Sequence, residues 1–460
     1  MKDDSPECAC VELISRVRRM LTLLPHNAKL NLFKNQHSFQ RQKVFVLSDL
    51  CNKLLRIETF VRGTWKTCMG KETTTMKLFH LSDLHIGKIV NGYEMWEDQR
   101  YVFDQILAYV REEQPDAVMI AGDIYDKAVP SAKAVTEFDE FLTALADSGT
   151  TILIISGNHD SAERLDFASS IMKKQNIYMK GTYGGEAMKV TMQDKWGDVN
   201  FYLMPFVKPA NVKNTLSDLT EEPEKEAAAL TYTEAMQQAV AAMQVDPGKR
   251  NVLIAHQNVT NSGVNRRSDS ETISIGGLDN IDRTVFDIFD YVALGHLHSP
   301  QQIGKPEIRY CGTPVIYSMS EADDQKSVTV VELGEKGKLS IRELPLHQLH
   351  AWYNFTGTLD EAMSREANED YARIVLTDKE TIIDVQARLR TMYKNLMSVE
   401  FQMADGSSPE QERTLEDVKN LAPDEAFADF YNRKTKRELS DENAAYIRQL
   451  IRDYYEQRQG

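Results

Sequence analysis

The sequence is poor in cysteine and in long apolar runs. Five of its 460 residues are cysteine, and Cys311 is the only one among residues 76–460. This usage is typical of a reduced, intracellular protein without a disulfide framework. Since no run of about 18 uncharged apolar residues is present, we set aside a membrane-spanning protein. Asp3, Asp4 and Glu7 stand where a secretion signal is positive, so we expect a cytoplasmic location.

Positive charge is also scarce. The chain has 54 Lys and Arg against 69 Asp and Glu, a net charge of −15. Residues 1–75 hold 13 basic and 7 acidic residues, which leaves −21 for residues 76–460. This excess of acid argues against binding nucleic acid by surface charge alone. It leaves open an enzyme whose positive charge is bound metal. With 42% hydrophobic residues the chain has enough apolar material for packed cores, and its length suggests about three domains.

Residues 1–75 show no strong hydrophobic period. We interpret them as an extension outside the fold, which a start codon assigned too early would explain. The alternative is a basic arm that contacts nucleic acid. Cys8 and Cys10 are a weak metal signal, because no second cysteine pair accompanies them.

From Met76 onward, short apolar runs alternate with helical patterns. The runs predict strands, and helical spacing of apolar residues predicts helices between the first three of them. This order predicts an α/β fold, a layered β-sandwich flanked by helices, in which ligands gather at the carboxyl ends of the strands. The expected strands are 77–82, 117–121, 151–155, 252–255, 291–294, 327–333 and 339–343, and the expected helices are 97–113 and 131–146.

Polar residues suited to chemistry follow five of these strands. Each segment taken alone is ordinary turn or capping chemistry. Together they place five of the ten histidines just beyond predicted strands, which packing does not explain. The segments are Asp83-Leu84-His85, Gly122-Asp123-Ile124-Tyr125-Asp126, Gly157-Asn158-His159-Asp160, His256, and Gly295-His296-Leu297-His298.

These residues suit two metal ions. They offer carboxylate, amide and imidazole ligands without thiolate, a mixture that favours Mn²⁺, with Mg²⁺ as an alternative. Two ions about 3.5–4 Å apart hold the attacking and leaving oxygens of an in-line phosphoryl displacement. The candidate ligands are Asp83, His85, Asp123, Asn158, His256, His296 and His298.

In order and spacing the five segments resemble the calcineurin-like metallophosphoesterase superfamily. The opening run 76–88, the run 291–298 and the run 310–321 are similar to SbcD-type nucleases, kin of double-strand-break repair nucleases. The resemblance implies that Asp83, His85 and His298 hold one ion, that Asn158, His256 and His296 hold the other, and that Asp123 bridges them. It implies further that His159 is catalytic, steadying the scissile phosphate and protonating the leaving oxygen. We expect the Asp126 carboxylate to orient His159.

Outside these segments the sequence is less specific. We expect an exposed helix within 220–243 and a loop at 261–275 whose Arg266 and Arg267 either contact a phosphate backbone or only face solvent. Residues 351–413 resemble a small α/β capping domain, with a strand at 372–376, a helix at 382–393 and a strand at 396–403. Its cations are Arg373, Arg388, Arg390 and Lys394.

The last part of the chain, 414–460, predicts amphipathic helices with aromatic residues, such as the one that Ser440 would cap. The resemblance implies that this tail docks on an SbcC-type coiled-coil ATPase, and that the domain at 76–350 forms a homodimer within a heterotetramer.

The predicted function is a metal-dependent DNA nuclease, with exonuclease action on double-stranded DNA and endonuclease action on hairpin or single-stranded DNA. A phosphomonoesterase or cyclic-nucleotide phosphodiesterase remains an alternative, because one metal pair serves all these reactions in the superfamily. A DNA-end tether without important catalysis is a third hypothesis, which the complete ligand set disfavours.

Overall fold

The computed structural model describes residues 75–217, 230–261, 265–271, 279–378 and 384–402, with short stretches at 427–428, 431–432, 443–445 and 447–449. The predictions for residues 1–74, and most of those for the tail at 414–460, fall outside the described residues. The chain divides into two compact units, residues 1–74 and 75–460, and all the described residues belong to the second. No helix in the described ranges has the length and apolar character that crossing a bilayer requires.

The first sheet has six strands in the order β16-β15-β1-β4-β5-β6. Its middle part is parallel because helices α4 (Trp96–Glu113) and α5 (Ala132–Asp147) carry the chain back between strands. β15 and β16 then return antiparallel beside β1. The strands are β1 (Met76–Leu81), β4 (Ala117–Ala121), β5 (Thr151–Ile155), β6 (Ile177–Lys180), β15 (Ser327–Leu333) and β16 (Leu339–Pro345).

The second sheet also has six strands, in the order β13-β14-β12-β9-β8-β7. Its four middle strands are parallel, and β7 and β13 pair antiparallel at the edges. The strands are β7 (Met188–Asp194), β8 (Gly197–Met204), β9 (Arg250–His256), β12 (Tyr291–Gly295), β13 (Gln301–Ile303) and β14 (Lys305–Tyr310).

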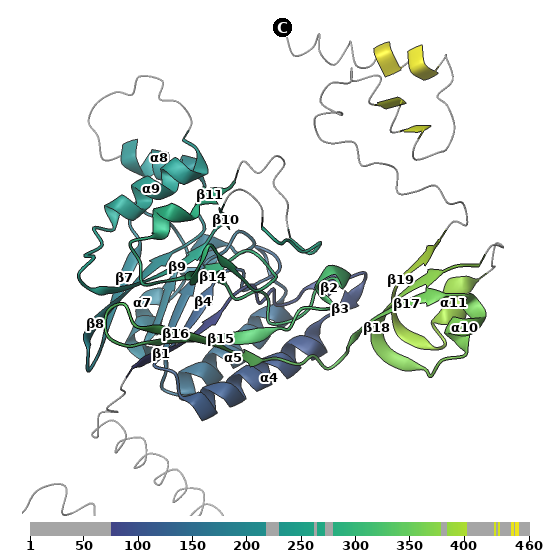
Figure 1. Ribbon diagram of the computed structural model, residues 1–460, viewed down its shortest axis with the longest axis horizontal. Coiled ribbons are helices and arrows are strands. Elements are labelled where there is room, and N and C mark those ends of the chain that lie inside the picture. Colours follow the sequence, from purple (N-terminus) through teal and green to yellow (C-terminus); the bar gives the residue numbers. More distant parts are fainter. Residues whose placement is uncertain are drawn as a thin grey trace, which may run out of the picture. The chain divides into compact units, whose positions relative to one another are not determined.

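The two sheets pack face to face through a shared apolar core that includes Leu78, Met119, Phe201 and Ile254. The outer face of the first sheet packs on α4 and α5, and the outer face of the second packs on α9 (Tyr232–Ala242). In Figure 1, α4 and α5 lie on one side of the sheets, and α9 lies with α8 (Pro209–Ser217) on the other. This arrangement confirms the predicted layered α/β sandwich.

The strands and helices expected between 76 and 350 lie where the sequence patterns place them, but β6, β7, β8, β13 and β14 were not predicted. The inserted segment also needs a correction. The exposed helix expected within 220–243 is described as α9, and its Ala235, Met236 and Ala239 are buried. The prediction of an exposed helix is therefore wrong for this part. An amphipathic helix that begins with a capping box at Thr231 and Glu234 packs its apolar face on the second sheet.

Short elements connect the larger ones. They comprise β2 (Ile89–Val90), β3 (Tyr93–Glu94), α6 (Ala162–Leu165), α7 (Ser169–Met172), β10 (Val259–Thr260), β11 (Ile281–Asp282) and 3₁₀ turns at Lys173–Gln175, Arg283–Phe286 and Met319–Glu321.

A third, parallel sheet follows, in the order β17-β18-β19. It consists of β17 (Trp352–Gly357), β18 (Asn368–Leu376) and β19 (Tyr393–Phe401), with helices α10 (Leu359–Met363) and α11 (Val385–Leu389). The helix expected at 382–393 is thus too long at its end. Helix α11 ends at Leu389, and Tyr393 begins β19, where it pairs with Asn368 of β18. The buried Tyr393 hydroxyl donates to the Ala362 carbonyl at 2.9 Å.

Contacts between this small sheet and helix α4 centre on Asp98. The carboxylate of Asp98 accepts from the Tyr371 hydroxyl at 2.7 Å and from both the main-chain N–H and the Nδ1 of His350, at 3.0 and 2.9 Å. Asp98 is fully buried, so these bonds satisfy a carboxylate that would otherwise be costly to bury.

Candidate metal centre

The five polar segments meet at one place because of strand direction. β1, β4 and β5 run parallel in the first sheet, and β9 and β12 run parallel in the second, so the carboxyl ends within each sheet share an edge. Five of the seven predicted ligands are buried and the other two are half-buried. The buried ones are Asp83, His85, Asp123, His256 and His298, and the half-buried ones are Asn158 and His296.

One group of candidate ligands consists of Asp83, His85 and His298. One ligand atom of each lies within 4.8 Å of the others. Nε2 of His85 faces Nε2 of His298 at 3.2 Å and lies 4.0 Å from the Asp83 carboxylate. Nδ1 of His85 is buried without a hydrogen-bond partner. Two imidazole nitrogens and a carboxylate oxygen directed at one point suit a cation.

A second group lies beside the first. Oδ1 of Asn158 is 3.0 Å from Nε2 of His256 and 3.0 Å from Nδ1 of His296. The Asp123 carboxylate stands between the groups, with Oδ2 at 3.5 Å from Nε2 of His256 and 3.7 Å from Nε2 of His85. The structure therefore brings all seven predicted residues together. Their division between two ions, with Asp123 as the bridge, stays a prediction.

The backbone at these residues is strained. Asp83, His85 and Asp123 adopt φ values of 53°, 44° and 51°, and His296 adopts 112°. Residues other than glycine rarely adopt positive φ angles, and each such backbone conformation costs about 1–3 kcal/mol of folding free energy. Main-chain bonds hold the strained turns in place, among them the N–H of Asp83 to the Gly122 carbonyl at 3.0 Å. Residues with strained backbone conformations are concentrated at sites where several side chains must point at one ligand.

Close approach explains two of the glycines. A Cβ at Gly157 would lie 2.0 Å from Oδ1 of Asp123, and one at Gly295 would lie 2.0 Å from the Ala121 carbonyl oxygen. Neither position has space for a side chain, so glycine lets the ligand loops pack against each other.

Burial acts strongly on the pKa of Asp83, His85, Asp123, His256 and His296, although neighbouring charges outweigh its effect at His256 and Asp123. It raises the pKa of Asp83 and lowers the pKa of His85 well below its usual range. Burial and the adjacent His256 lower the pKa of His296 to about 3. For His256 burial acts in the same direction, but the Asp123 and Asp83 carboxylates outweigh it and raise its pKa to about 9. A divalent cation would offset the buried carboxylates and accept the imidazole lone pairs, so these residues fit such an ion.

His159 lies at the edge of the cluster, with a side chain that is 26% exposed. Its main-chain N–H donates to Oδ1 of Asp123 at 2.8 Å, and its Nε2 lies 4.0 Å from Oδ2 of Asp123. Nδ1 of His159 contacts the main-chain carbonyl oxygen of Asp126 at 2.9 Å, whereas the Asp126 carboxylate accepts from Lys88 at 2.8 Å. Asp126 does contact His159, but the prediction that its carboxylate makes the contact is wrong. The main-chain carbonyl oxygen of Asp126 accepts the hydrogen bond instead. The positions of two residues in the sequence do not show whether a carboxylate oxygen or a main-chain carbonyl oxygen accepts the hydrogen bond from a histidine.

Asp160 ties the loops together. Its carboxylate accepts from the main-chain N–H groups of Gly157, Ile124 and Tyr125 at 2.9, 3.2 and 3.0 Å. It therefore joins the loop after β5 to the loop after β4, and this bonding shapes the turn that carries Asn158 and His159.

Several supporting residues were not predicted. Gln99 donates to the carbonyl of the metal-ligand candidate His85 at 2.8 Å and to the Tyr317 hydroxyl at 2.8 Å. Lys88, whose ammonium donates to the Asp126 carboxylate, lies in the first motif but had no assigned role.

Arg266, proposed as a phosphate contact, pairs with Asp324 at 2.5 Å while its side chain stays 58% exposed. Whether it also meets a phosphate stays a prediction.

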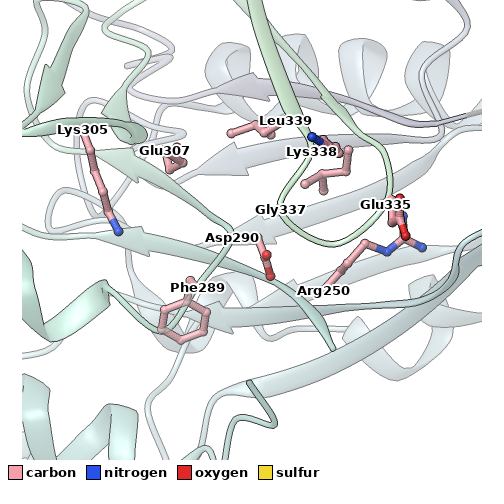
Figure 2. A pocket seen from close by; sticks show the side chains of 10 residues that line it. Arg250, Phe289, Asp290, Lys305, Glu307, Glu335, Gly337, Lys338 and Leu339 are labelled. Carbon is pink, nitrogen blue, oxygen red and sulfur yellow. The ribbon is translucent and has the colours of Figure 1, made fainter. Parts of the chain in front are cut away.

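A cavity of about 220 Å³ lies at the other end of the second sheet, where Arg250 begins β9 and Asp290 precedes β12 (Figure 2). Three of its charged side chains are paired, Arg250 with Asp194 at 2.5 Å, Asp290 with Lys336 at 2.8 Å and Lys305 with Asp287 at 2.8 Å. This cavity lies at the amino ends of β9 and β12, whereas the candidate metal centre lies at their carboxyl ends.

Comparison with known proteins gives two family matches. Residues 76–300 match a model described as calcineurin-like phosphoesterase, and residues 345–435 match one described as type 5 capsule protein repressor C-terminal domain.

Two curated relatives illustrate the similarity. The proteins named as the D subunit of nuclease SbcCD from Staphylococcus epidermidis and Staphylococcus saprophyticus are each 29% identical over 384 residues, covering 82% of this chain and 98% of theirs. A solved structure titled GAP50, the anchor in the inner membrane complex of Plasmodium, aligns at 12% identity over 73% of this chain and 99% of that one, with a TM-score of 0.35. That similarity is too low to carry an argument.

Proposed function

We propose that this chain, whose residues 76–300 match the calcineurin-like phosphoesterase model, is a metal-dependent DNA nuclease of that family. In this proposal it is the SbcD-type subunit of an ATP-dependent complex in DNA repair and recombination. The observation that carries it is the convergence of Asp83, His85, Asp123, Asn158, His256, His296 and His298 at the carboxyl ends of the parallel strands. The two staphylococcal relatives are named as a nuclease subunit, which supports a nucleic acid over a small phosphoester as the substrate.

A second observation also favours a polymeric substrate. A cavity of about 380 Å³ beside the metal centre is lined both by the phosphoesterase part and by the small sheet. Lys88 and Ser270 contribute from the first, and Trp352, Arg373 and Ser398 contribute from the second. Cations and a Trp ring are residue types that contact phosphates and bases in single-stranded nucleic acid. Here each cation already has a carboxylate partner, Lys88 with Asp126 at 2.8 Å and Arg373 with Glu400 at 2.6 Å, so a phosphate would share the cation with that carboxylate. This cavity extends the site beyond what a small monoester would need.

The proposed chemistry assigns a task to each group. Asp83, His85 and His298 would hold one divalent ion, and Asn158, His256 and His296 another, with Asp123 between them. When bound, the ions, Mn²⁺ in our proposal and Mg²⁺ as the alternative, would lower the pKa of water and offset negative charge on the phosphate. Nδ1–H of His159 donates to the Asp126 carbonyl, which fixes the ring and leaves Nε2 to face the site. In the protonated ring, Nε2 would donate its proton to the departing 3′ or 5′ oxygen.

The proposed organisation follows the same assignment. Residues 76–350 form the nuclease domain, 351–413 the capping domain that guides DNA, and 414–460 the docking tail for the SbcC-type ATPase. We further propose exonuclease action on double-stranded DNA, endonuclease action on hairpin or single-stranded DNA, and a homodimer within a heterotetramer.

The test uses the full-length chain, alone and with the ATPase, on linear, hairpin and single-stranded DNA with Mn²⁺. A phosphomonoester such as p-nitrophenyl phosphate is assayed in parallel. We expect DNA cleavage that depends on Asp123. Hydrolysis of the monoester with no DNA cleavage under any pairing would instead favour a phosphomonoesterase.

A further inference from the structure

His298 is held at three of its atoms by residues from outside the ligand motifs. Its Nδ1 lies 2.5 Å from the Ser270 hydroxyl, and its main-chain N–H donates to Oε1 of Glu271 at 2.8 Å. Its carbonyl oxygen accepts from the Lys326 ammonium and from the main-chain N–H of Thr313, each at 3.0 Å. The loop at 265–271 therefore hydrogen-bonds to both the ring and the main chain of His298.

Behind this loop lies Glu321, whose side chain is completely buried. Its Oε1 accepts from the hydroxyls of Ser268 and Ser270, each at 2.5 Å. Its Oε2 accepts from the Lys326 ammonium at 2.7 Å and from the Thr313 hydroxyl at 3.2 Å. Both carboxylate oxygens are thus engaged, and the paired Lys326 balances the buried charge.

The direction of the bonds decides the state of the His298 ring. A carboxylate only accepts, so the Ser270 hydroxyl donates to Glu321 and uses its oxygen to accept from Nδ1–H of His298. With the proton on Nδ1, the lone pair of the neutral ring is on Nε2. That is the nitrogen that faces Nε2 of His85 at 3.2 Å within the candidate metal centre.

We infer that Ser270 and Glu321 are positioning residues for the metal ligand His298, acting as a relay from a buried carboxylate through a hydroxyl to the imidazole. The inference rests on the proposed function, since it takes His298 to be a ligand. Partners of this kind fix the tautomer and orientation of a ligating histidine, and their loss typically weakens metal affinity about 10–100-fold. The Mn²⁺ affinity of the centre therefore depends on the hydrogen bond from Nδ1–H of His298 to the Ser270 hydroxyl and on the bond from that hydroxyl to Glu321.

The experiment measures Mn²⁺ binding to the full-length protein by isothermal titration calorimetry, without any substrate. Ser270→Ala and Glu321→Gln are compared with wild type, and thermal unfolding verifies that each variant is folded. Ser270→Thr keeps the hydroxyl and serves as the rescue. Ser320→Ala is the matched control, because Ser320 bonds to Ser268 and Asp269 in the same cluster and its hydroxyl is not bonded to His298.

We expect Ser270→Ala to weaken one class of Mn²⁺ site about 10–100-fold, while Ser270→Thr and Ser320→Ala bind like wild type. Should Glu321→Gln fail to fold, Ser270→Ala alone decides, because it removes one hydroxyl and leaves the Glu321–Lys326 pair intact. If folded Ser270→Ala protein bound Mn²⁺ at both sites with wild-type affinity, the inference would be overturned and the proposed function would still stand. A wild-type protein that binds no Mn²⁺ would overturn both.

Discussion

Replacing Gly157 by alanine should disable the metal centre without changing any ligand. A Cβ at this position would lie 2.0 Å from Oδ1 and 2.4 Å from the main-chain nitrogen of Asp123, where real contacts stay above 3.0 Å. The Asp123 carboxylate must therefore move by about 1 Å. A shift of that size at a reacting centre costs about 10²-fold in rate, or about 2.7 kcal/mol of transition-state stabilisation.

The assay is Mn²⁺-dependent cleavage of DNA by the full-length protein, with kcat/KM measured beside Mn²⁺ affinity. Gly184→Ala is the control, because a Cβ there meets nothing within 4 Å. We expect Gly157→Ala to lose activity about 100-fold and to bind Mn²⁺ more weakly, with Gly184→Ala close to wild type. If a folded Gly157→Ala protein kept wild-type activity, Asp123 would not have the central place assigned to it.

Three further predictions address the leaving group, the small sheet and the tail. His159→Ala should retain Mn²⁺ by elemental analysis but lose about 10²–10⁴-fold in cleavage rate; retained cleavage would remove His159 from its role. Asp98→Ala leaves the buried partners Tyr371 and His350 without their acceptor and should lower the free energy of unfolding in urea by about 1–3 kcal/mol, whereas no change would show that these bonds contribute nothing net. Deleting residues 440–460 should abolish association with the SbcC-type ATPase in a pull-down, and undiminished association would refute the docking role.

The part of the fold that carries the candidate centre was predictable because its strands are buried on both faces. Such strands appear as continuous apolar runs, as in Ala117–Ala121 and Thr151–Ile155, and these were located to the residue. The edge strand Met188–Asp194 was missed because its exposed and buried residues alternate and give no such run. β17, in the small sheet, was missed for a similar reason, since Phe355 is its only buried residue.

Some residues of the candidate centre were likewise predictable from the sequence and others were not. Its ligands were predictable because each stands within a few residues of a recognisable strand end, in a segment whose chemistry is visible locally. Ser270 and Glu321 are 51 residues apart and meet only in the folded chain, so no local pattern pairs them. The Asp126 correction has the same origin, because sequence names a residue but not whether its carboxylate or its carbonyl makes the contact.

The central claim is that bound divalent metal, held around Asp123, cleaves phosphodiester bonds in DNA. The most direct test follows cleavage of a linear DNA substrate by the full-length protein with the proposed SbcC-type ATPase, first in EDTA and then after adding excess Mn²⁺. We predict no cleavage in EDTA, cleavage after Mn²⁺ is restored, and none at any stage in Asp123→Ala. Cleavage that persists in EDTA, or that Asp123→Ala performs like wild type, would contradict the claim.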